Sequence, residues 1–393
     1  MASKPYTCRW AALSLSTIAG VFFPDIQLPR ETSETINHKL VTVSTTGSDA
    51  KAQNWFDEKN IQRSDSIEVY HDWQRMLDEA EFDVVYISTP HPLHYHHVKY
   101  ALERKRNVLV EKPATMNAAQ YRKLAELAKK QGVVLMEAMW TRYLPATRYF
   151  KEELLPRIGE VRRVYADFSF PIVSPDLPHT SRFLSKAAGA GSLLDQGVYA
   201  LTWADLGLHG YSNSSAVVTK VAYANSMSIR GVPGEVDDID TVVLTKQSPE
   251  SKTQEAIAIV TTSMTLPGSS KPAFYQRLQA NKSAPSVRIE ASKASVALSF
   301  PPIRPEELRV QWYDTEHLDQ HGIEKEEVIK QPVGRGWGMW YQADEIATRV
   351  ALREAGAEGE VIGLEETIRV LEWMDEARAH AGIYYDSELE KAQ

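Results

Sequence analysis

Three short segments hold polar side chains that can donate or accept protons, and each follows an apolar run typical of a buried strand. The segments are STPHPLH (88–94), EKP (111–113) and EAMWTRY (137–143). Open parallel sheets bind ligands at the carboxyl ends of their strands, so we expect these segments along one edge of a sheet. There, Lys112 can donate to a substrate oxygen or stabilise an ionised phenol beside it. The spacing alone fits a surface lysine at a strand end equally well.

A carboxyl group and a phenol lie close together in a second part of the chain. In LLDQGVYAL, Asp195 and Tyr199 are four residues apart and share one face of a helix. Both are costly to bury inside an apolar helix without polar partners, so the segment predicts a site. A structural hydrogen bond between the two side chains is the alternative.

Four histidines cluster at His91, His94, His96 and His97. His94 and His97 are expected on one helix face. No carboxylate or cysteine lies nearby at a spacing typical of metal ligands, so we expect no metal site. A histidine in the first turn of a helix, facing a nucleotide or capping the helix, fits the pattern better.

The pattern from Lys39 to Glu137 alternates short β-branched runs with longer helical stretches. It predicts a Rossmann-like, doubly wound parallel sheet with crossover helices. The expected strands are KLVTVST (39–45), DVVYIST (83–89), NVLV (107–110) and VVLMEA (133–138). Ahead of them, RWAALSLSTIAG (9–20) has the apolar start of a first strand and then runs into small and hydroxyl residues.

After Tyr143 the pattern changes to long alternating runs with hairpin-like breaks, interrupted by the helical segment that holds Asp195. This predicts an α+β domain with a large, mostly antiparallel open sheet and helices on one face. We therefore expect an α/β protein with a dinucleotide-binding domain over 1–142 and a substrate and dimerisation domain over 143–393. The last helices are expected to return to the first domain.

Composition excludes several classes of protein. The chain has 393 residues, enough for two cores, and Lys+Arg 44 against Asp+Glu 52 gives 44 − 52 = −8. Without a dense basic run, a nucleic-acid partner is not expected. No apolar run is long enough to span a bilayer. Lys4 and Arg9 before an apolar stretch imitate a secretory signal, but that stretch fits the first strand and helix. A single cysteine, Cys8, excludes an intrachain disulfide and suits the expected cytoplasmic location.

Four ordered segments resemble the glucose–fructose oxidoreductase/inositol dehydrogenase (GFO/IDH/MocA) family of NAD(P)-dependent enzymes. They are STPHPLHYHHVKYAL, NVLVEKPATMNAAQ, VLMEAMWTRYLPA and GAGSLLDQGVYALTW. Within the family, the chain looks most like the dimeric dihydrodiol dehydrogenases and the fungal NADP-dependent D-xylose 1-dehydrogenases. The resemblance covers nearly the whole chain and implies a Rossmann domain followed by an α+β domain. It also implies a homodimer formed through the open sheet.

The resemblance assigns roles to individual residues. It implies that Tyr199 is the general acid/base, that Lys112 contacts the nicotinamide ribose and the substrate, and that Asp195 orients the substrate. The residues implied to bind substrate are Trp140, Arg142, Asp195 and Tyr199. The residues implied to bind the cofactor, NADP or NAD, are Leu15, Ser16, Thr17, Ile18, Thr46, Thr89, Pro90, His94, Glu111, Lys112 and Trp340.

The implied reaction is the oxidation of a sugar or cyclic diol hydroxyl. Tyr199, assisted by Lys112, takes the hydroxyl proton while the hydride of the same carbon passes to C4 of the nicotinamide. An aldose or diol then becomes a lactone or a ketone-level product.

The first turn departs from the family pattern, which has glycine at the positions of Ala11 and Ser16. Glycine permits a tight turn and a close backbone approach to the pyrophosphate, and a Cβ at either position can clash or forbid positive φ. A strained left-handed residue costs roughly 1–3 kcal/mol. The turn therefore either weakens cofactor binding or follows another course. Thr46 provides neither an arginine for a 2′-phosphate nor a carboxylate for a ribose, so the choice between NADP and NAD stays open.

Two other functions stay open on the sequence. The glycine-free turn also fits a non-redox biosynthetic isomerase or cyclase on the same scaffold, with Tyr199 and Lys112 as acid and base and a degenerate nucleotide site. The other possibility on this fold is a regulatory protein that binds and senses a ligand but does not transform it.

Overall fold

The computed structural model covers most of the chain. It describes residues 6–392 apart from 30–35, 62–66, 175, 179, 211–217, 233, 249–252, 271–284, 315, 317, 319, 321, 323–325 and 355–363. In this part of the chain, no helix has the length and apolar character needed to cross a membrane. Two compact units are formed, the first by Met1–Trp140, Gly334–Ile368 and Glu388–Gln393 and the second by Thr141–Val333 and Arg369–Ser387.

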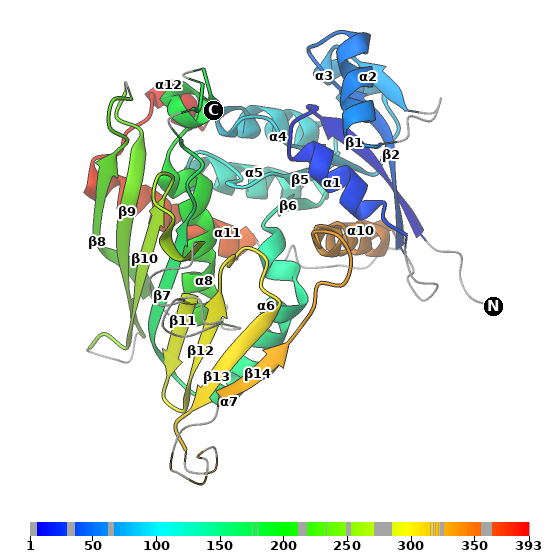
Figure 1. The fold of residues 1–393 in the computed structure, drawn as a ribbon. Helices are drawn as coiled ribbons and strands as arrows, with labels where there is room; N and C mark the ends of the chain where they lie inside the picture. Colours follow the sequence, from blue (N-terminus) through cyan, green and yellow to red (C-terminus); the bar gives the residue numbers. More distant parts are fainter. Residues whose placement is uncertain are drawn as a thin grey trace, which may run out of the picture. The chain divides into compact units, whose positions relative to one another are not determined.

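The first unit contains the predicted doubly wound sheet, coloured blue to cyan in Figure 1. Its strands follow the order β3-β2-β1-β4-β5-β6, and all neighbours are parallel. The strands are β1 (Tyr6–Leu13), β2 (Ile36–Ser44), β3 (Glu68–Tyr70), β4 (Val84–Ile87), β5 (Asn107–Val110) and β6 (Leu135–Glu137). The strand order reverses between β1 and β4, and a crevice for a ligand is expected at such a switch point.

Three helices of the first unit, α2, α3 and α5, begin at a residue whose side chain caps them. Ser48 accepts from Lys51 N, Asp72 accepts from Gln74 N, and Asn117 accepts from Gln120 N. Side-chain acceptors of this kind satisfy amides that have no partner inside the helix. The helices are α1 (Ala19–Ile26), α2 (Asp49–Glu58), α3 (Trp73–Glu79), α4 (His94–Glu103), α5 (Ala118–Gln131) and α10 (Trp340–Glu354).

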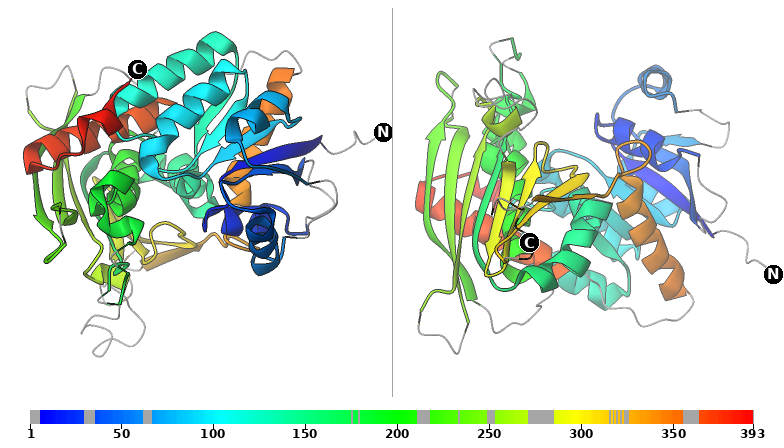
Figure 2. Two further views of the ribbon diagram at one scale, coloured as in Figure 1. Left: turned by 90° about the horizontal axis from the view of Figure 1, so that it is seen from above. Right: turned by 60° about the horizontal axis from the view of Figure 1, so that its bottom comes forward.

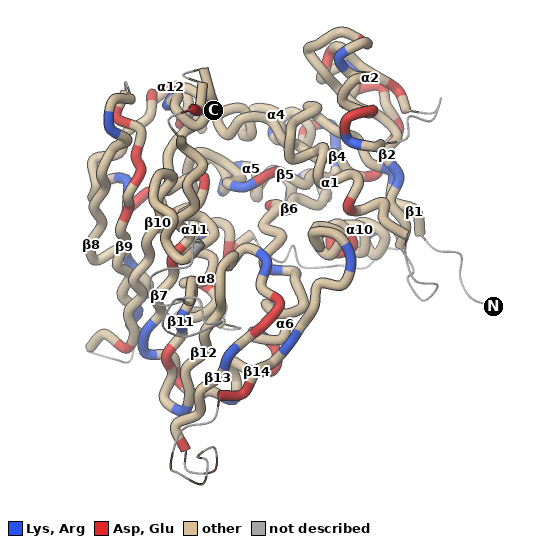
Figure 3. Tube along the Cα trace, viewed as in Figure 1, with Lys and Arg blue, Asp and Glu red and all other residues tan. Residues whose placement is uncertain are grey.

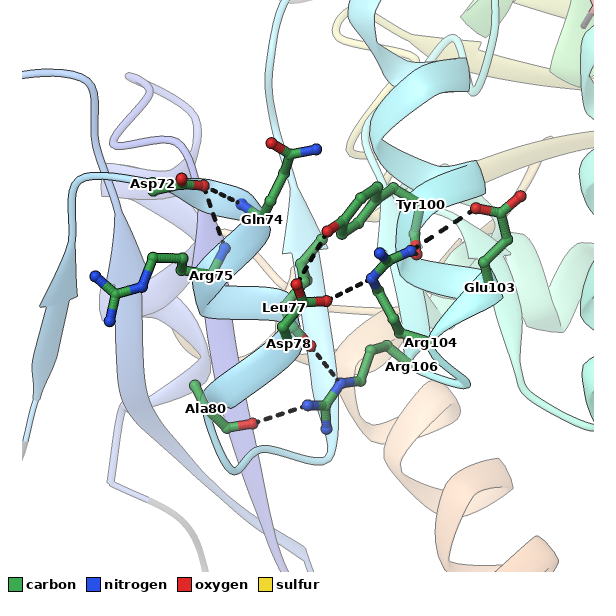
Figure 4. A network of polar contacts seen from close by, with 10 residues as sticks. All are labelled: Asp72, Gln74, Arg75, Leu77, Asp78, Ala80, Tyr100, Glu103, Arg104 and Arg106. Carbon is green, nitrogen blue, oxygen red and sulfur yellow. Dashed lines mark hydrogen bonds and ion pairs between the residues drawn. The ribbon is translucent and has the colours of Figure 1, made fainter.

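Two arginines tie α3 to α4 and to the residue before β5 (Figure 4). Arg104 Nε donates to Asp78 Oδ1 over 2.5 Å, and Tyr100 OH donates to Asp78 Oδ2 over 3.0 Å. Arg106 donates to two carbonyl oxygens of α3 and its end, those of Leu77 (2.9 Å) and Ala80 (3.1 Å). The two crossover helices are therefore held side by side by charged groups as well as by their apolar faces.

A buried carboxylate joins α1 to the segment that precedes α10. Asp25 Oδ1 accepts from Trp337 N over 2.5 Å, and Oδ2 accepts from Met339 N over 2.7 Å. Gly336 has φ +57°, and a Cβ there would lie 2.0 Å from Asp25 Oδ1, so both conformation and space require glycine. Burial raises the pKa of Asp25, and the backbone amides partly oppose this rise.

The second unit is built on a sheet of eight strands in the order β14-β13-β12-β11-β7-β10-β9-β8. All neighbours are antiparallel except β7 and β10, so the predicted mostly antiparallel sheet is confirmed. The strands are β7 (Val161–Ser169), β8 (Val218–Ser228), β9 (Asp237–Gln247), β10 (Ala256–Ser263), β11 (Pro285–Ala291), β12 (Ala294–Ser299), β13 (Glu307–Trp312) and β14 (Glu326–Lys330).

Helix α8 (Val198–His209) packs on one face of this sheet, and every residue in it is buried. A Cβ at Gly207 would lie 2.8 Å from Val164 Cγ2, so the helix approaches β7 closely. Among the described residues of this unit, no helix covers the opposite face of β8 and β9 (Figure 2). The other helices of this unit are α6 (Pro145–Tyr149), α7 (Leu155–Ile158) and most of α11 (Leu364–Ala381), whereas α12 (Ser387–Glu390) belongs almost wholly to the first unit.

The strand pattern did not reveal β3 or β14. Strand β3 has three residues, too few for a recognisable alternation. Strand β14 is a charged edge strand, EEVIK, and Arg309 Nη1 of β13 pairs with Glu326 Oε2 over 2.8 Å. Figure 3 shows both signs of charge on these two strands. Charged residues are common on edge strands because they discourage pairing with other chains.

We expect Asp25→Ala to lower the free energy of unfolding of the first unit by about 2–4 kcal/mol, because two buried amides lose their acceptor. Asp25→Asn keeps one acceptor and is expected to lose less. Urea unfolding followed by tryptophan fluorescence measures the change. Asp49→Ala, at an exposed position, serves as the control. Unchanged unfolding of Asp25→Ala would show that the carboxylate does not hold this segment.

Candidate active site

The turn between β1 and α1 keeps a left-handed residue although it contains no glycine. Ser14 has φ +94°, and its backbone N donates to Ser44 O over 3.2 Å. Ser16 Oγ accepts from Ala19 N over 3.0 Å and donates to Ser88 Oγ over 2.7 Å. The turn is thus tied both to the end of β2 and to the residue after β4.

The turn follows another course, which is one of the two alternatives that its glycine-free sequence left open. Ala11 lies inside β1 and is fully buried, and positive φ in the turn falls on Ser14 rather than on Ala11 or Ser16. Ser16 caps the first turn of α1 through its side chain, a role that glycine cannot perform. Ser14 was missed because φ is not visible in the residue types, and serine there carries a local cost of roughly 1–3 kcal/mol.

The residues after β4 and β5 are joined through a buried histidine. His94 Nε2 lies 2.7 Å from Thr89 O, and His94 Nδ1 lies 3.0 Å from Pro113 O. Thr89 Oγ1 lies 3.0 Å from His97 Nδ1. Burial lowers the pKa of both His94 and His97 to about 4, so both rings are neutral near pH 7. A neutral imidazole carries one N–H, so His94 donates to one of these two carbonyl oxygens at a time while it packs between the two strand ends.

The EKP segment is fixed on both sides of Lys112. Tyr86 OH donates to Glu111 Oε1 over 2.5 Å, and Lys112 N donates to Glu111 Oε2 over 3.3 Å. After the proline, Ala114 N donates to Glu137 Oε1 over 3.0 Å. Burial raises the pKa of Glu111, against the opposing effects of Tyr86 and Lys112. The structure thus brings Thr89, His94, Glu111 and Lys112 together at one edge of the sheet.

Five other residues expected to bind the cofactor occupy three places in the first unit. Leu15, Thr17 and Ile18 lie in the turn with Ser16, and Thr46 is exposed between β2 and α2. Trp340 is the first residue of α10 and follows Met339, whose backbone N donates to Asp25 in the last turn of α1. Ser16 caps the first turn of α1, so Trp340 and Ser16 lie near opposite ends of this helix. Trp340 stacks on Tyr341 and under the Arg335 guanidinium. A role for Trp340 toward the cofactor stays a prediction.

In the second unit, Asp195 and Tyr199 lie at the start of the buried helix, as the spacing suggested. Asp195 is in a π-helical turn, Leu193–Gly197, and Tyr199 is in the first turn of α8. The Asp195 carboxylate is 3% exposed and pairs with Arg182, whose Nη1 lies 3.3 Å from Oδ1. The Tyr199 ring meets the Phe168 ring edge-on at 5.5 Å. Arg182, which the sequence did not single out, holds the carboxylate.

The π-helical turn is anchored to the sheet beneath it. Ser192 Oγ lies 2.9 Å from Thr262 Oγ1, and Gln196 Nε2 donates to Phe170 O over 2.8 Å. Because β10 and the residue after β7 supply these partners, the turn that contains Asp195 is held by segments that are distant in the sequence. A carboxylate and a phenol are costly to bury in an apolar helix unless polar partners are buried beside them. This arrangement supplies such partners on one side of the helix.

Arg142, expected to line the substrate pocket, has a buried carboxylate as its partner. Arg142 Nη1 lies 3.0 Å from Asp205 Oδ2, and Arg369 Nε lies 2.6 Å from Asp205 Oδ1. Burial of Asp205 would raise its pKa, but the two guanidinium charges bring it below its usual value. Trp140 is buried in the first unit. Contact of Trp140 and Arg142 with substrate stays a prediction.

Both halves of the chain match models of one protein family. The model described as "Oxidoreductase family, NAD-binding Rossmann fold" matches residues 27–139. The model of the GFO/IDH/MocA C-terminal domain matches residues 156–296. The chain belongs to the GFO/IDH/MocA oxidoreductase family. It is therefore a dehydrogenase-like oxidoreductase, as the sequence suggested.

Relatives within the GFO/IDH/MocA family match along nearly the whole chain. A D-xylose 1-dehydrogenase (NADP(+)) of Hypocrea jecorina is 28% identical over 97% of this chain and 94% of its own length. A trans-1,2-dihydrobenzene-1,2-diol dehydrogenase of Xenopus laevis is 26% identical over 96% of this chain and 99% of its own. The crystal structure of an aldose-aldose oxidoreductase from Caulobacter crescentus shares the fold, with a TM-score of 0.70 at 20% identity, covering 96% of this chain and 98% of that one.

The first unit fits a dinucleotide in spite of its missing glycines. The ends of β1, β2 and β4 meet at the turn, where Ser14 takes the left-handed conformation that a close backbone approach uses. The first turn of α1 contains no acidic residue to repel a pyrophosphate. That the backbone of Leu15–Ile18 in this GFO/IDH/MocA protein holds the pyrophosphate stays a prediction.

We expect Ser14→Gly to raise the free energy of unfolding of the first unit by about 1 kcal/mol, because it removes the cost of a left-handed serine. Ser16→Gly, two residues away, is expected to lower the same free energy by about 1 kcal/mol, because the cap on Ala19 and the bond to Ser88 are lost. Thermal and urea unfolding of the matched pair measure both changes. If Ser16→Gly raises the free energy of unfolding and Ser14→Gly lowers it, the strained residue is Ser16.

Proposed function

We propose that this protein is an NADP-dependent dehydrogenase that oxidises a hydroxyl group of a sugar or a cyclic diol. The arrangement of Asp195 and Tyr199 carries the proposal. A carboxylate held by Arg182 and a phenol lie at the start of one buried helix, so an acid/base group and a group that accepts a substrate hydroxyl are close together. The names of the full-length relatives, a D-xylose 1-dehydrogenase (NADP(+)) and a dihydrodiol dehydrogenase, support the substrate class.

Each polar residue has one task in the proposed reaction. Tyr199 accepts the proton of the substrate hydroxyl, and the Lys112 ammonium stabilises the phenolate and contacts the nicotinamide ribose. Asp195, kept in place by Arg182, accepts a hydrogen bond from a second substrate hydroxyl and so orients the reacting carbon. When bound, NADP supplies the hydride acceptor.

The choice of NADP over NAD rests on relatives and on the end of β2. The relative that covers 97% of the chain is named as an NADP(+) enzyme. The two residues after this strand end, Thr46 and Gly47, carry no carboxylate, so neither of them repels a 2′-phosphate. Titration of the protein with NADPH and with NADH, followed by tryptophan fluorescence, compares the two. Binding of neither below about millimolar concentration would contradict the dehydrogenase proposal.

We expect Tyr199→Phe and Lys112→Met each to lower kcat by about 10²- to 10⁴-fold, the usual contribution of general acid–base catalysis. NADPH formation is measured with D-xylose and with a trans-dihydrodiol as substrates. Tyr384→Phe, at a side chain that is 70% exposed, and Lys130→Met, on the exposed surface of α5, are the matched controls. Full turnover by Tyr199→Phe would refute its proposed role.

The same assay separates the two other functions considered for this sequence. An isomerase or cyclase would convert substrate without added nucleotide. A sensor would bind ligand without turnover and would keep its ligand affinity in Tyr199→Phe. The dehydrogenase proposal requires turnover that depends strictly on added nucleotide.

We also propose that the open face of the second unit joins two copies of this chain. Four side chains form a row across β8, β9, β10 and β7, since Tyr223 pairs with Val243, Val243 with Ile259, and Ile259 with Tyr165. Tyr223 is 53% exposed, and the other three are half-buried. A row of apolar side chains on an uncovered sheet face is typical of an interface.

We expect Ile259→Glu to raise the dimer dissociation constant at least about tenfold, because a charge must then be buried in the interface. Light scattering coupled to size-exclusion chromatography measures the mass as a function of concentration. Leu352→Glu, at an exposed apolar position of the first unit, is the control. A wild-type protein that stays monomeric at high concentration would contradict the dimer.

A further inference from the structure

A cluster of buried acidic and phenolic groups lies under the turn that leads to Asp195. Asp237 and Asp240, both in β9, are 1% and 2% exposed, and Tyr385 is buried as well. None of these three residues has a part in the proposed reaction. Buried groups of this kind are costly unless they serve as partners of other polar groups.

Two hydrogen bonds connect this cluster to the turn. Leu193 N donates to Asp237 Oδ2 over 2.9 Å, and Tyr385 OH donates to Ala190 O over 2.8 Å. Gly191 lies between these two contacts, and a Cβ there would lie 2.1 Å from Asp237 Oδ1 and 2.7 Å from Tyr385 OH. Its φ of +151° also favours glycine. The turn is therefore clamped from both sides at very close range.

The clamp reaches Asp195 through a single step. Asp195 N donates to Gly191 O over 3.0 Å, so the backbone of Asp195 is bonded to the residue that the clamp encloses. Leu193, which Asp237 holds, is the first residue of the π-helical turn that contains Asp195. A shift of residues 190–193 must therefore move the Asp195 carboxylate.

Asp240 lies next to Asp237 in this cluster, and the two carboxyl groups interact electrostatically. Burial raises the pKa of both groups, and the charge of Asp237 raises that of Asp240 further. Ser226 of β8 is the register partner of Asp240. Asp237 Oδ2 accepts from Leu193 N, so Asp237 is the member of this pair that contacts the turn.

We infer that Asp237, together with Tyr385, is a positioning residue for Asp195, which it serves by clamping the 190–193 turn. The inference rests on the proposed function, in which Asp195 orients the substrate. Under this inference, neither Asp237 nor Tyr385 touches the substrate. Their effect is on where the Asp195 carboxylate lies, and a small displacement of such a group is costly to the reaction.

The neighbour of Asp237 provides a matched control. Asp238 is also buried in β9, but its hydrogen bonds go to the end of β10, where Oδ1 accepts from Ser263 Oγ, Met264 N and Thr265 N. Asp238→Ala therefore removes a buried carboxylate and destabilises the same sheet without removing a hydrogen bond to the 190–193 turn. Asp237→Asn is the rescue variant, because its amide oxygen can still accept from Leu193 N.

The test measures hydrogen exchange and steady-state kinetics in the full-length protein. In Asp237→Ala we expect amide exchange in residues 190–197 to quicken at least about tenfold and kcat to fall about 10- to 100-fold. The dissociation constant for NADPH should not change. Asp237→Asn should restore both values to within about threefold of wild type, and Asp238→Ala should show neither effect. Tyr385→Phe, which keeps the ring, should change both in the same direction and replaces Asp237→Ala if that variant does not fold.

Two outcomes would overturn the inference. One is unchanged exchange in residues 190–197 of both Asp237→Ala and Tyr385→Phe. The other is an equal loss of kcat in Asp237→Ala and Asp238→Ala, which would assign the loss to general destabilisation. If the wild-type protein shows no nucleotide-dependent turnover, the proposed function fails, and the exchange rates alone still decide whether Asp237 clamps the turn.

Discussion

Backbone N–H groups at turns and helix starts need acceptors, and in this protein buried carboxylates supply several of them. Asp25 accepts from the segment before α10, Glu137 accepts from the residue after the EKP proline, and Asp237 accepts from the start of the π-helical turn. Each carboxylate belongs to a strand or a helix, and each amide belongs to a connecting segment or to the start of a helical turn. The regular elements thereby fix the loops that carry the functional groups.

The same constraint explains how the candidate residues of each unit are held in place. In the first unit, the backbone of Lys112 lies between Glu111, to which Tyr86 OH donates, and Pro113, whose carbonyl oxygen lies 3.0 Å from His94 Nδ1. Asp195 lies between Arg182 on its side chain and Gly191 on its backbone. Groups held in this way lose little conformational entropy when a substrate binds, which means that they are preorganised.

The first turn shows how a fold tolerates the loss of glycines. The Ser16 side chain makes two hydrogen bonds, to Ala19 N and to Ser88 Oγ, which glycine cannot make. Ser14 adopts the left-handed conformation at an energetic cost. The sheet on both sides holds the turn in its course, because Ser14 N is bonded to Ser44 O at the end of β2. Tertiary contacts therefore decide the path of this turn more than its residue types do.

The sequence by itself determined the two sheets, the helix that carries Asp195 and Tyr199, and the strand end that carries Lys112. Each of these depends on periodicity or spacing within a short window, and such patterns follow from the geometry of helices and strands. The tertiary structure alone decided that Ser14 is the left-handed residue, that Arg182 pairs with Asp195, that Arg142 pairs with Asp205, and that Asp237 holds Leu193. Asp237 and Leu193 are 44 positions apart, and β9 meets the turn only after the sheet has formed. No local pattern encodes that contact, because it arises from strand order and from the space that Gly191 leaves open.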